Sequence, residues 1–99
     1  MKLVTTINTL QDKEKQLDKV LEFNNNKVMH LQLKKGASIP EHNAPFNVLV
    51  VVRKGKLLFD VSGTKSELTN ENFIHLTPLE KHSLEAMEDT DVLVIKIGK

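Results

Sequence analysis

From residue 27 onward, apolar and polar residues alternate in short runs that are separated by turn residues. Met29, Leu31 and Leu33, for example, alternate with His30 and Gln32, so that one face of this segment is apolar and the other polar. A period of two is typical of a β-strand with one buried face, and it places His30 on the surface. The same pattern predicts strands near residues 57–61, 73–77, 82–86 and 92–97, and we expect about eight or nine short strands in all.

Two segments depart from this alternation. Residues 48–52 are all apolar, which predicts a strand that is covered on both faces. The polar stretch from Asn8 to Lys19 fits a loop that leads into a strand near Lys19–Phe23, with a short helix near Asp12–Leu17 as the alternative. The following Asn24–Asn26 suits a chain reversal, since Asn tolerates a positive φ angle. Many short strands with little convincing helix predict an all-β sandwich or barrel.

Composition limits the number of domains and the kinds of partner. The 99 residues suffice for one domain, which we expect to span residues 1–99. Lys and Arg number 14 against 13 Asp and Glu, and this balance argues against nucleic acid or a membrane surface as a partner. The chain has no Cys, which excludes disulfides, thiolate metal sites and a Cys nucleophile. No apolar run suits a signal peptide or a membrane span, so we expect a cytoplasmic protein.

Two short segments carry a recognisable spacing. Gly36 is followed by five residues and His42, and six residues separate Val48 from Gly55. Residues 36–55 therefore resemble the first cupin motif, in which Gly, five residues, His-x-His, three or four residues, Glu, six residues and Gly follow one another. Residues 72–86 resemble the second cupin motif, which has a Pro-x-Gly turn before a His. Here Pro78 and His82 match, whereas Glu80 stands in place of the glycine.

The resemblance implies a double-stranded β-helix, the jelly-roll barrel of the cupins. Cupins bind metal with both His and the Glu of the first motif and the His of the second. In this chain those four positions hold His42, Ala44, Val48 and His82, so two imidazoles remain. Catalytic metal sites usually keep three protein ligands. We therefore expect no tightly held cofactor, and at most a divalent metal bound weakly by His42 and His82.

Strand alternation gives a second view of the same positions. If His42 points inward, a continuous strand also turns alternate residues as far as Val52 inward. His82 brings Leu84 and Ala86 inward in the same way. The result is either an apolar cavity with two imidazoles near its mouth or an interior that is simply filled. For the first case, the predicted ligand-binding residues are His42, Ala44, Phe46, Val48, Val50, His82 and Leu84.

Other polar residues give weaker signals. His75 shares a strand face with Phe73 and is a candidate third ligand, although a structural role is more common for such a residue. The acidic residues between Glu85 and Asp91 lack the spacing of a calcium loop and fit a solvated turn. General acid–base chemistry near neutral pH would fall to His42 or His82.

These observations predict a binding domain without strong catalysis that holds a small, partly apolar ligand in the barrel. The alternative is a metal-dependent enzyme of oxygenase or isomerase type that uses His42, His82 and a third ligand; an interaction module is a further possibility. We also expect a homodimer, because Leu3, Val4 and Ile7 form an apolar segment that needs burial and a small barrel has open sheet edges.

Overall fold

The computed structural model describes residues 1–98, and within them β-strands are the only extended regular elements. This confirms the predicted all-β class. The nine strands are β1 (Lys15–Phe23), β2 (Asn26–Leu33), β3 (Ser38–His42), β4 (Asn47–Lys54), β5 (Leu57–Val61), β6 (Thr64–Leu68), β7 (Phe73–Leu76), β8 (His82–Ala86) and β9 (Thr90–Ile97). Within residues 1–98, no helix has the length and apolar character needed to cross a membrane.

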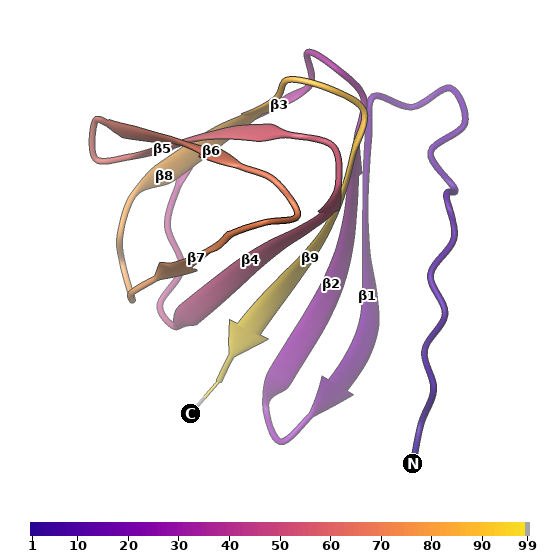
Figure 1. Ribbon diagram of the computed structural model, residues 1–99. Coiled ribbons are helices and arrows are strands. Elements are labelled where there is room, and N and C mark those ends of the chain that lie inside the picture. Colours follow the sequence, from indigo (N-terminus) through magenta and orange to yellow (C-terminus); the bar gives the residue numbers. More distant parts are fainter. Residues whose placement is uncertain (99) are drawn as a thin grey trace.

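The strands form two antiparallel sheets that face each other (Figure 1). One sheet has five strands in the order β1-β2-β9-β4-β7, and the other has four in the order β3-β8-β5-β6. Strands that are distant in sequence therefore lie side by side, as β2 and β4 do on either side of β9. The sheets stay separate instead of closing into a continuous barrel, and their inner faces enclose the core.

The first hairpin settles the open question about the N-terminal part of the chain. Strand β1 begins at Lys15, earlier than the expected start near Lys19, and it pairs with β2 along its length. The alternative helix near Asp12–Leu17 is therefore wrong. The predicted reversal is confirmed, since Asn24 and Asn25 have φ angles of 47° and 64°.

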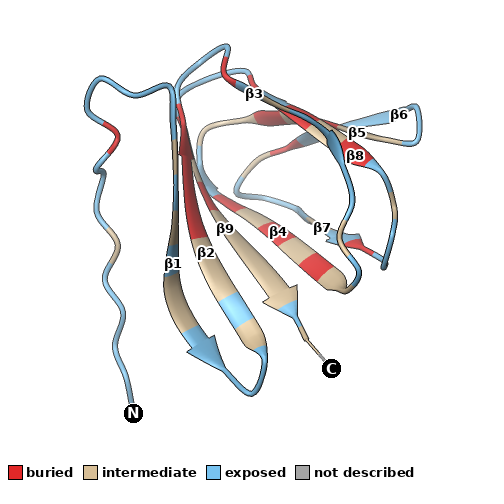
Figure 2. Cartoon of the chain, turned by 180° about the vertical axis from the view of Figure 1, so that it is seen from behind, coloured by how far each residue is buried: buried red, intermediate tan, exposed pale blue. Residues whose placement is uncertain are grey.

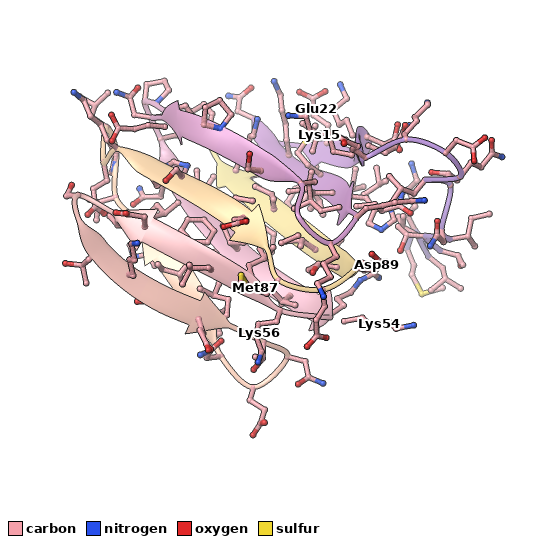
Figure 3. The ribbon with its side chains drawn as sticks, turned by 90° about the horizontal axis from the view of Figure 1, so that it is seen from above. Lys15, Glu22, Lys54, Lys56, Met87 and Asp89 are labelled. Carbon is pink, nitrogen blue, oxygen red and sulfur yellow. The ribbon has the colours of Figure 1, made fainter. Side chains whose placement is uncertain are left out.

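One end of the sandwich is filled by tightly packed apolar side chains. The turns that carry Lys54, Lys56, Met87 and Asp89 gather at this end (Figure 3). Gly55 has a φ angle of +95°, and a Cβ atom there would overlap the Asp89 carbonyl oxygen, so the turn requires glycine. The side chains that fill this end of the core, each at most 1% exposed, are Leu33, Val52, Leu57, Ala86 and Val92.

The stretch between His42 and Val52 is not the continuous strand that the alternation argument assumed. Strand β3 ends at His42 in the four-stranded sheet, and β4 begins at Asn47 in the five-stranded sheet. Residues 43–46 carry the chain from one sheet to the other. Strand β4 also differs from the expected two-sided burial, because buried and half-buried residues alternate along it. Its inner face is fully covered and its outer face only partly.

His30 is buried, with 3% of its side chain exposed, so its expected surface position is wrong. The alternation itself was right: His30 and Gln32 lie on the outer face of β2. That face is covered because the chain before β1 runs alongside the five-stranded sheet (Figure 2). The Thr9 amide donates to Gln32 Oε1 at 2.9 Å and Gln32 Nε2 donates to Thr9 Oγ1 at 3.0 Å, which fastens this segment to β2.

An ionic cluster also holds His30 on the outer face. Its Nε2 lies 3.0 Å from Asp91 Oδ2, and Arg53 Nε donates to Asp91 Oδ1 at 2.9 Å. Arg53 Nη2 also donates to the Thr6 hydroxyl. Asp91 is therefore half-buried in a network, and the interpretation of the acidic segment as a solvated turn does not hold for this residue.

Candidate functional site

A cavity of about 270 Å³ lies between the two sheets, away from the filled end. Its walls are mostly apolar, and its lining includes all seven residues that the sequence predicts to contact a ligand. The structure thus brings together residues from both motifs, and their role in binding stays a prediction. These residues are His42, Ala44, Phe46, Val48, Val50, His82 and Leu84.

Register explains how the two sheets build this cavity. In the five-stranded sheet, neighbouring inward residues on β2, β9 and β4 form one wall: Met29, Val94 and Val50. On β9 and β4 this row lies two residues further from the filled end than Val92 and Val52. In the four-stranded sheet, Phe59 lies beside Leu84, and the next inward pair is Val61 and His82. The apolar walls therefore come from the same alternation that builds the core.

Sequence reasoning missed several residues that line the cavity. Met29, Leu31 and Phe59 could have been found, because they belong to the apolar faces of strands that the alternation identified. Ile39 lies on β3, which no pattern predicted. Lys96 also lines the cavity, and its signal is its place two residues after Val94 on the inward face of β9.

The two imidazoles are in direct contact at the ends of neighbouring strands. His42 closes β3 and His82 opens β8, and the two residues are partners in the register of that pair. Their ring centroids are 4.2 Å apart with an interplanar angle of 63°, an edge-to-face arrangement. His82 is buried and its ring also stacks on Phe59, with centroids 5.8 Å apart.

Backbone carbonyls determine which ring nitrogens are available. Nδ1 of His42 lies 2.9 Å from the Pro40 carbonyl oxygen, and Nδ1 of His82 lies 3.0 Å from that of Glu80. Since a carbonyl oxygen only accepts, each neutral ring carries its proton on Nδ1 and has its lone pair on Nε2. Among residues 1–98, neither Nε2 atom has a hydrogen-bond partner. Both rings can therefore accept a hydrogen bond or bind a metal through Nε2.

His82 is held in the neutral state. Burial lowers the pKa of His82 below its ordinary value, and the adjacent His42 lowers it further, whereas the bond to the Glu80 carbonyl oxygen acts in the opposite direction. A neutral imidazole is the form that accepts through Nε2. The site therefore presents His82 as an acceptor near neutral pH.

The turn before β8 joins the two motif segments at the cavity rim. The Leu79 amide donates to the Ala44 carbonyl oxygen at 2.7 Å. Leu79 has a φ angle of 69°, so the residue with a glycine-like conformation precedes Glu80, which the resemblance had placed at the motif glycine. Hydrogen bonds from the Thr77 hydroxyl and amide lower the pKa of Glu80 and fix its carboxylate within this turn.

His75 does not join the imidazole pair. It lies exposed on the outward face of β7, together with Phe73 as expected, and its Nε2 is 2.8 Å from Asn47 Oδ1. The hypothesis that His75 is a third cavity ligand is therefore wrong. Within residues 1–98, no three His, Asp, Glu or Cys side chains come together in a way that could hold a metal ion.

The residues present do not fit the resident metal of the cupin motifs. Ala44 and Val48 both line the cavity near His42, and neither side chain has a donor atom. The two imidazoles alone fall short of the three protein ligands that catalytic metal sites usually keep. No chemical step that depends on a metal follows from this site.

A larger hollow, of about 550 Å³, lies on the outer surface and is a weaker candidate. It is formed between the segment before β1 and the ends of β2 and β9, and polar side chains such as Asn8, Gln11 and Asp89 make up much of its lining. Small-molecule sites usually combine apolar walls with a few convergent polar groups. The cavity between the sheets has that combination.

Comparisons with known proteins bear on the fold. No family model matches the chain, and no curated protein matches its sequence. Among solved structures, an RmlC-like cupin from Desulfovibrio desulfuricans is 21% identical with a TM-score of 0.79, and the match covers 97% of this chain and 92% of that one. An RmlC-like cupin with a double-stranded β-helix fold from Methanocaldococcus jannaschii is 16% identical with a TM-score of 0.79, covering 97% and 89%.

A third structure is similar over part of its length. A cupin 2 conserved barrel domain protein from Leptotrichia buccalis is 24% identical with a TM-score of 0.81, and the match covers 89% of this chain and 43% of that one. At these identities the likeness establishes the fold. The predicted cupin-type double-stranded β-helix is therefore confirmed.

Proposed function

We propose that this chain, which has the cupin fold, binds a small and partly apolar molecule in the cavity between its sheets, without strong catalysis. The observation that carries the proposal is the cavity itself. Apolar side chains from both sheets line it, and two imidazoles with free Nε2 atoms lie in the same lining. Apolar walls with a few polar groups for orientation are typical of small-molecule sites.

The chemistry of the imidazole pair favours binding over turnover. His82 accepts a hydrogen bond from a hydroxyl or amide group of a ligand, since its neutral form is favoured. Among residues 1–98, no carboxylate and no hydroxyl lines the cavity that could act with the imidazoles as nucleophile or second acid–base group. We further propose that a divalent metal binds only weakly, through His42 and His82.

Two neighbouring valines offer a matched test of cavity binding. Val50 lines the cavity, whereas Val51 lies on the outer face of the same strand. We expect untagged protein, purified without chelator, to retain a small molecule in native mass spectrometry and less than one equivalent of metal in elemental analysis. Val50→Phe fills the cavity and should abolish retention, and Val51→Phe should preserve it.

Two results would contradict this proposal. Equal retention by both valine variants would place the molecule outside the cavity. One equivalent of metal that survives dialysis would favour the metal-dependent enzyme instead and would require a protein ligand beyond the imidazole pair.

We also propose a homodimer. Leu3 and Ile7 are 86% and 69% exposed in the single chain, so the apolar N-terminal segment has no cover of its own. Strands β1 and β7 are the edges of the five-stranded sheet and can pair with a second copy. Sedimentation equilibrium at tens of micromolar should give about twice the 11.2 kDa of the chain; a mass of one chain would overturn the dimer.

A further inference from the structure

One charged side chain stands among the apolar walls of the cavity. Strand β9 turns Val92, Val94 and Lys96 to the inside, in steps that lead from the filled end into the cavity. Lys96 is half-buried, and its Nζ lies above the ring of Phe46, 6.0 Å from the centroid. Lysine is rarely placed in an apolar interior, because removing an ammonium group from water is costly unless an anion accompanies it.

Among residues 1–98, no carboxylate forms an ion pair with Lys96. Its neighbours in register are Lys27 on β2 and Val48 on β4. Two lysines directly opposite each other on adjacent strands repel. Lys27 in turn lies opposite Glu22 on β1, whereas Lys96 belongs to none of the three ion pairs found among residues 1–98. In the part of the chain that the structure describes, no Asp or Glu lines the cavity.

We propose that the ligand of this cavity is a small amphipathic carboxylate, with its carboxylate on Lys96 and its apolar part between the sheets. This inference rests on the proposed function and names its ligand class. The carboxylate of the ligand supplies the negatively charged partner that Lys96 lacks among residues 1–98. The Lys96 ammonium donates charge-assisted hydrogen bonds to this carboxylate. The apolar part takes the place of water against Val50, Phe59 and Leu84.

Pairs of probes that differ only in charge separate this inference from cavity binding itself. Phenylacetate and phenylacetamide have the same ring and nearly the same shape, and acetate has the charge without the ring. Binding is measured by calorimetry and located by the NMR shifts of the Val50 and Leu84 methyl groups. We expect phenylacetate to bind about tenfold more tightly than phenylacetamide, the ratio that one charge-assisted contact of about 1.4 kcal/mol produces, and acetate to bind too weakly to measure.

Two lysine variants complete the test. Lys96→Met keeps the length of the side chain and should lose the preference for phenylacetate while retaining the binding of phenylacetamide, which also shows that the variant is folded. Lys65→Met, on exposed β6 and outside the cavity lining, should keep the full preference.

The outcomes distinguish the two levels of the proposal. Equal binding of phenylacetate and phenylacetamide to the wild type, or a preference that survives in Lys96→Met, overturns the carboxylate assignment and leaves cavity binding intact. Failure of both aromatic probes to shift the Val50 and Leu84 methyl groups counts against the proposed function itself.

Discussion

A buried histidine lies on each side of the five-stranded sheet. His30 lies on its outer face, His82 belongs to the four-stranded sheet that its inner face packs against, and the two histidines have different partners. On the outer face, His30 Nε2 is engaged by Asp91, which also pairs with Arg53. On the inner side, His82 uses only Nδ1, on a backbone carbonyl, and its Nε2 stays free. Both side chains are nearly inaccessible, with 3% and 6% exposed. Burial alone therefore does not distinguish a structural histidine from a binding histidine, whereas the surroundings of the ring do: His30 contacts the carboxylate of an ion pair, and His82, which is bonded only to a backbone carbonyl, lines the cavity.

His30 and His82 differ in their hydrogen-bond partners because the outer face and the inner side are covered differently. A polar group that is buried without a partner destabilises the fold, so the outer face carries acceptors and donors that satisfy one another. The inner side encloses a cavity, so a ligand or solvent can reach the free nitrogen. We expect changes on the outer face to alter stability and changes on the inner side to alter binding.

The strongest test of the inner side is to complete its metal site. Ala44→His with Val48→Glu restores the three His and one Glu of the first and second motifs. A four-ligand site gains several kcal/mol over a two-ligand site, and we expect Ni²⁺ and Zn²⁺ affinity to rise roughly a thousandfold, or about 4 kcal/mol. Calorimetric titration of both proteins measures this gain. The buried carboxylate should lower the stability of the metal-free variant by about 1–3 kcal/mol.

Two controls define that result. Ala44→His with Val51→Glu places the carboxylate on the outer face and should gain far less affinity. His42→Ala in the wild type should remove the weak binding. If the restored variant gains nothing over the wild type, the four positions do not converge and the match between His82 and its motif is wrong.

The second test concerns the N-terminal segment on the outer side. Leu3→Ser with Ile7→Ser removes two exposed apolar side chains from each copy. If these side chains are buried between copies, each contributes about 1.5 kcal/mol or more, and the dimer dissociation constant should rise at least a hundredfold. Sedimentation equilibrium across a concentration series measures the change. An unchanged constant would locate the dimer contact elsewhere, for example on the edge strand β7.

The third test removes the centre of the outer ionic cluster. Asp91→Ala leaves His30 and Arg53 without their shared acceptor, and we expect a loss of about 2 kcal/mol in the free energy of unfolding. Urea denaturation measures the loss. The exposed Glu85 on β8 is the control, and Glu85→Ala should change stability by no more than about 0.5 kcal/mol. Equal effects of the two variants would show that the cluster does not stabilise the outer face.

The sequence predicts features that depend on local patterns and misses features that depend on contacts between distant segments. Alternation and motif spacing depend on local geometry. They therefore predicted the strands around Met29 and Phe59 and the common location of His42 and His82 at one cavity. The burial of His30 depends on a segment more than twenty residues away, and no local sequence pattern reveals this contact. Strand β3 and the crossover at residues 43–46 were missed because motif spacing does not mark where the chain changes sheets.

The smallest expected effect is a pH dependence of stability that His82 contributes. Burial lowers the pKa of His82 in the folded chain, whereas the unfolded chain titrates near the ordinary value of roughly 6.5. The unfolded state therefore takes up the proton first as the pH falls, and stability is lost from about 6.5 down to the folded pKa, below which the loss is constant. Urea midpoints of the wild type should fall between pH 7.5 and pH 5.5, and His82→Gln should reduce this fall. His75→Gln, exposed on the outward face of β7, is the matched control and should leave the His82 contribution in place. Identical pH profiles for the wild type and His82→Gln would show that burial does not disfavour the charged form of His82, and its assignment as a neutral acceptor would be wrong.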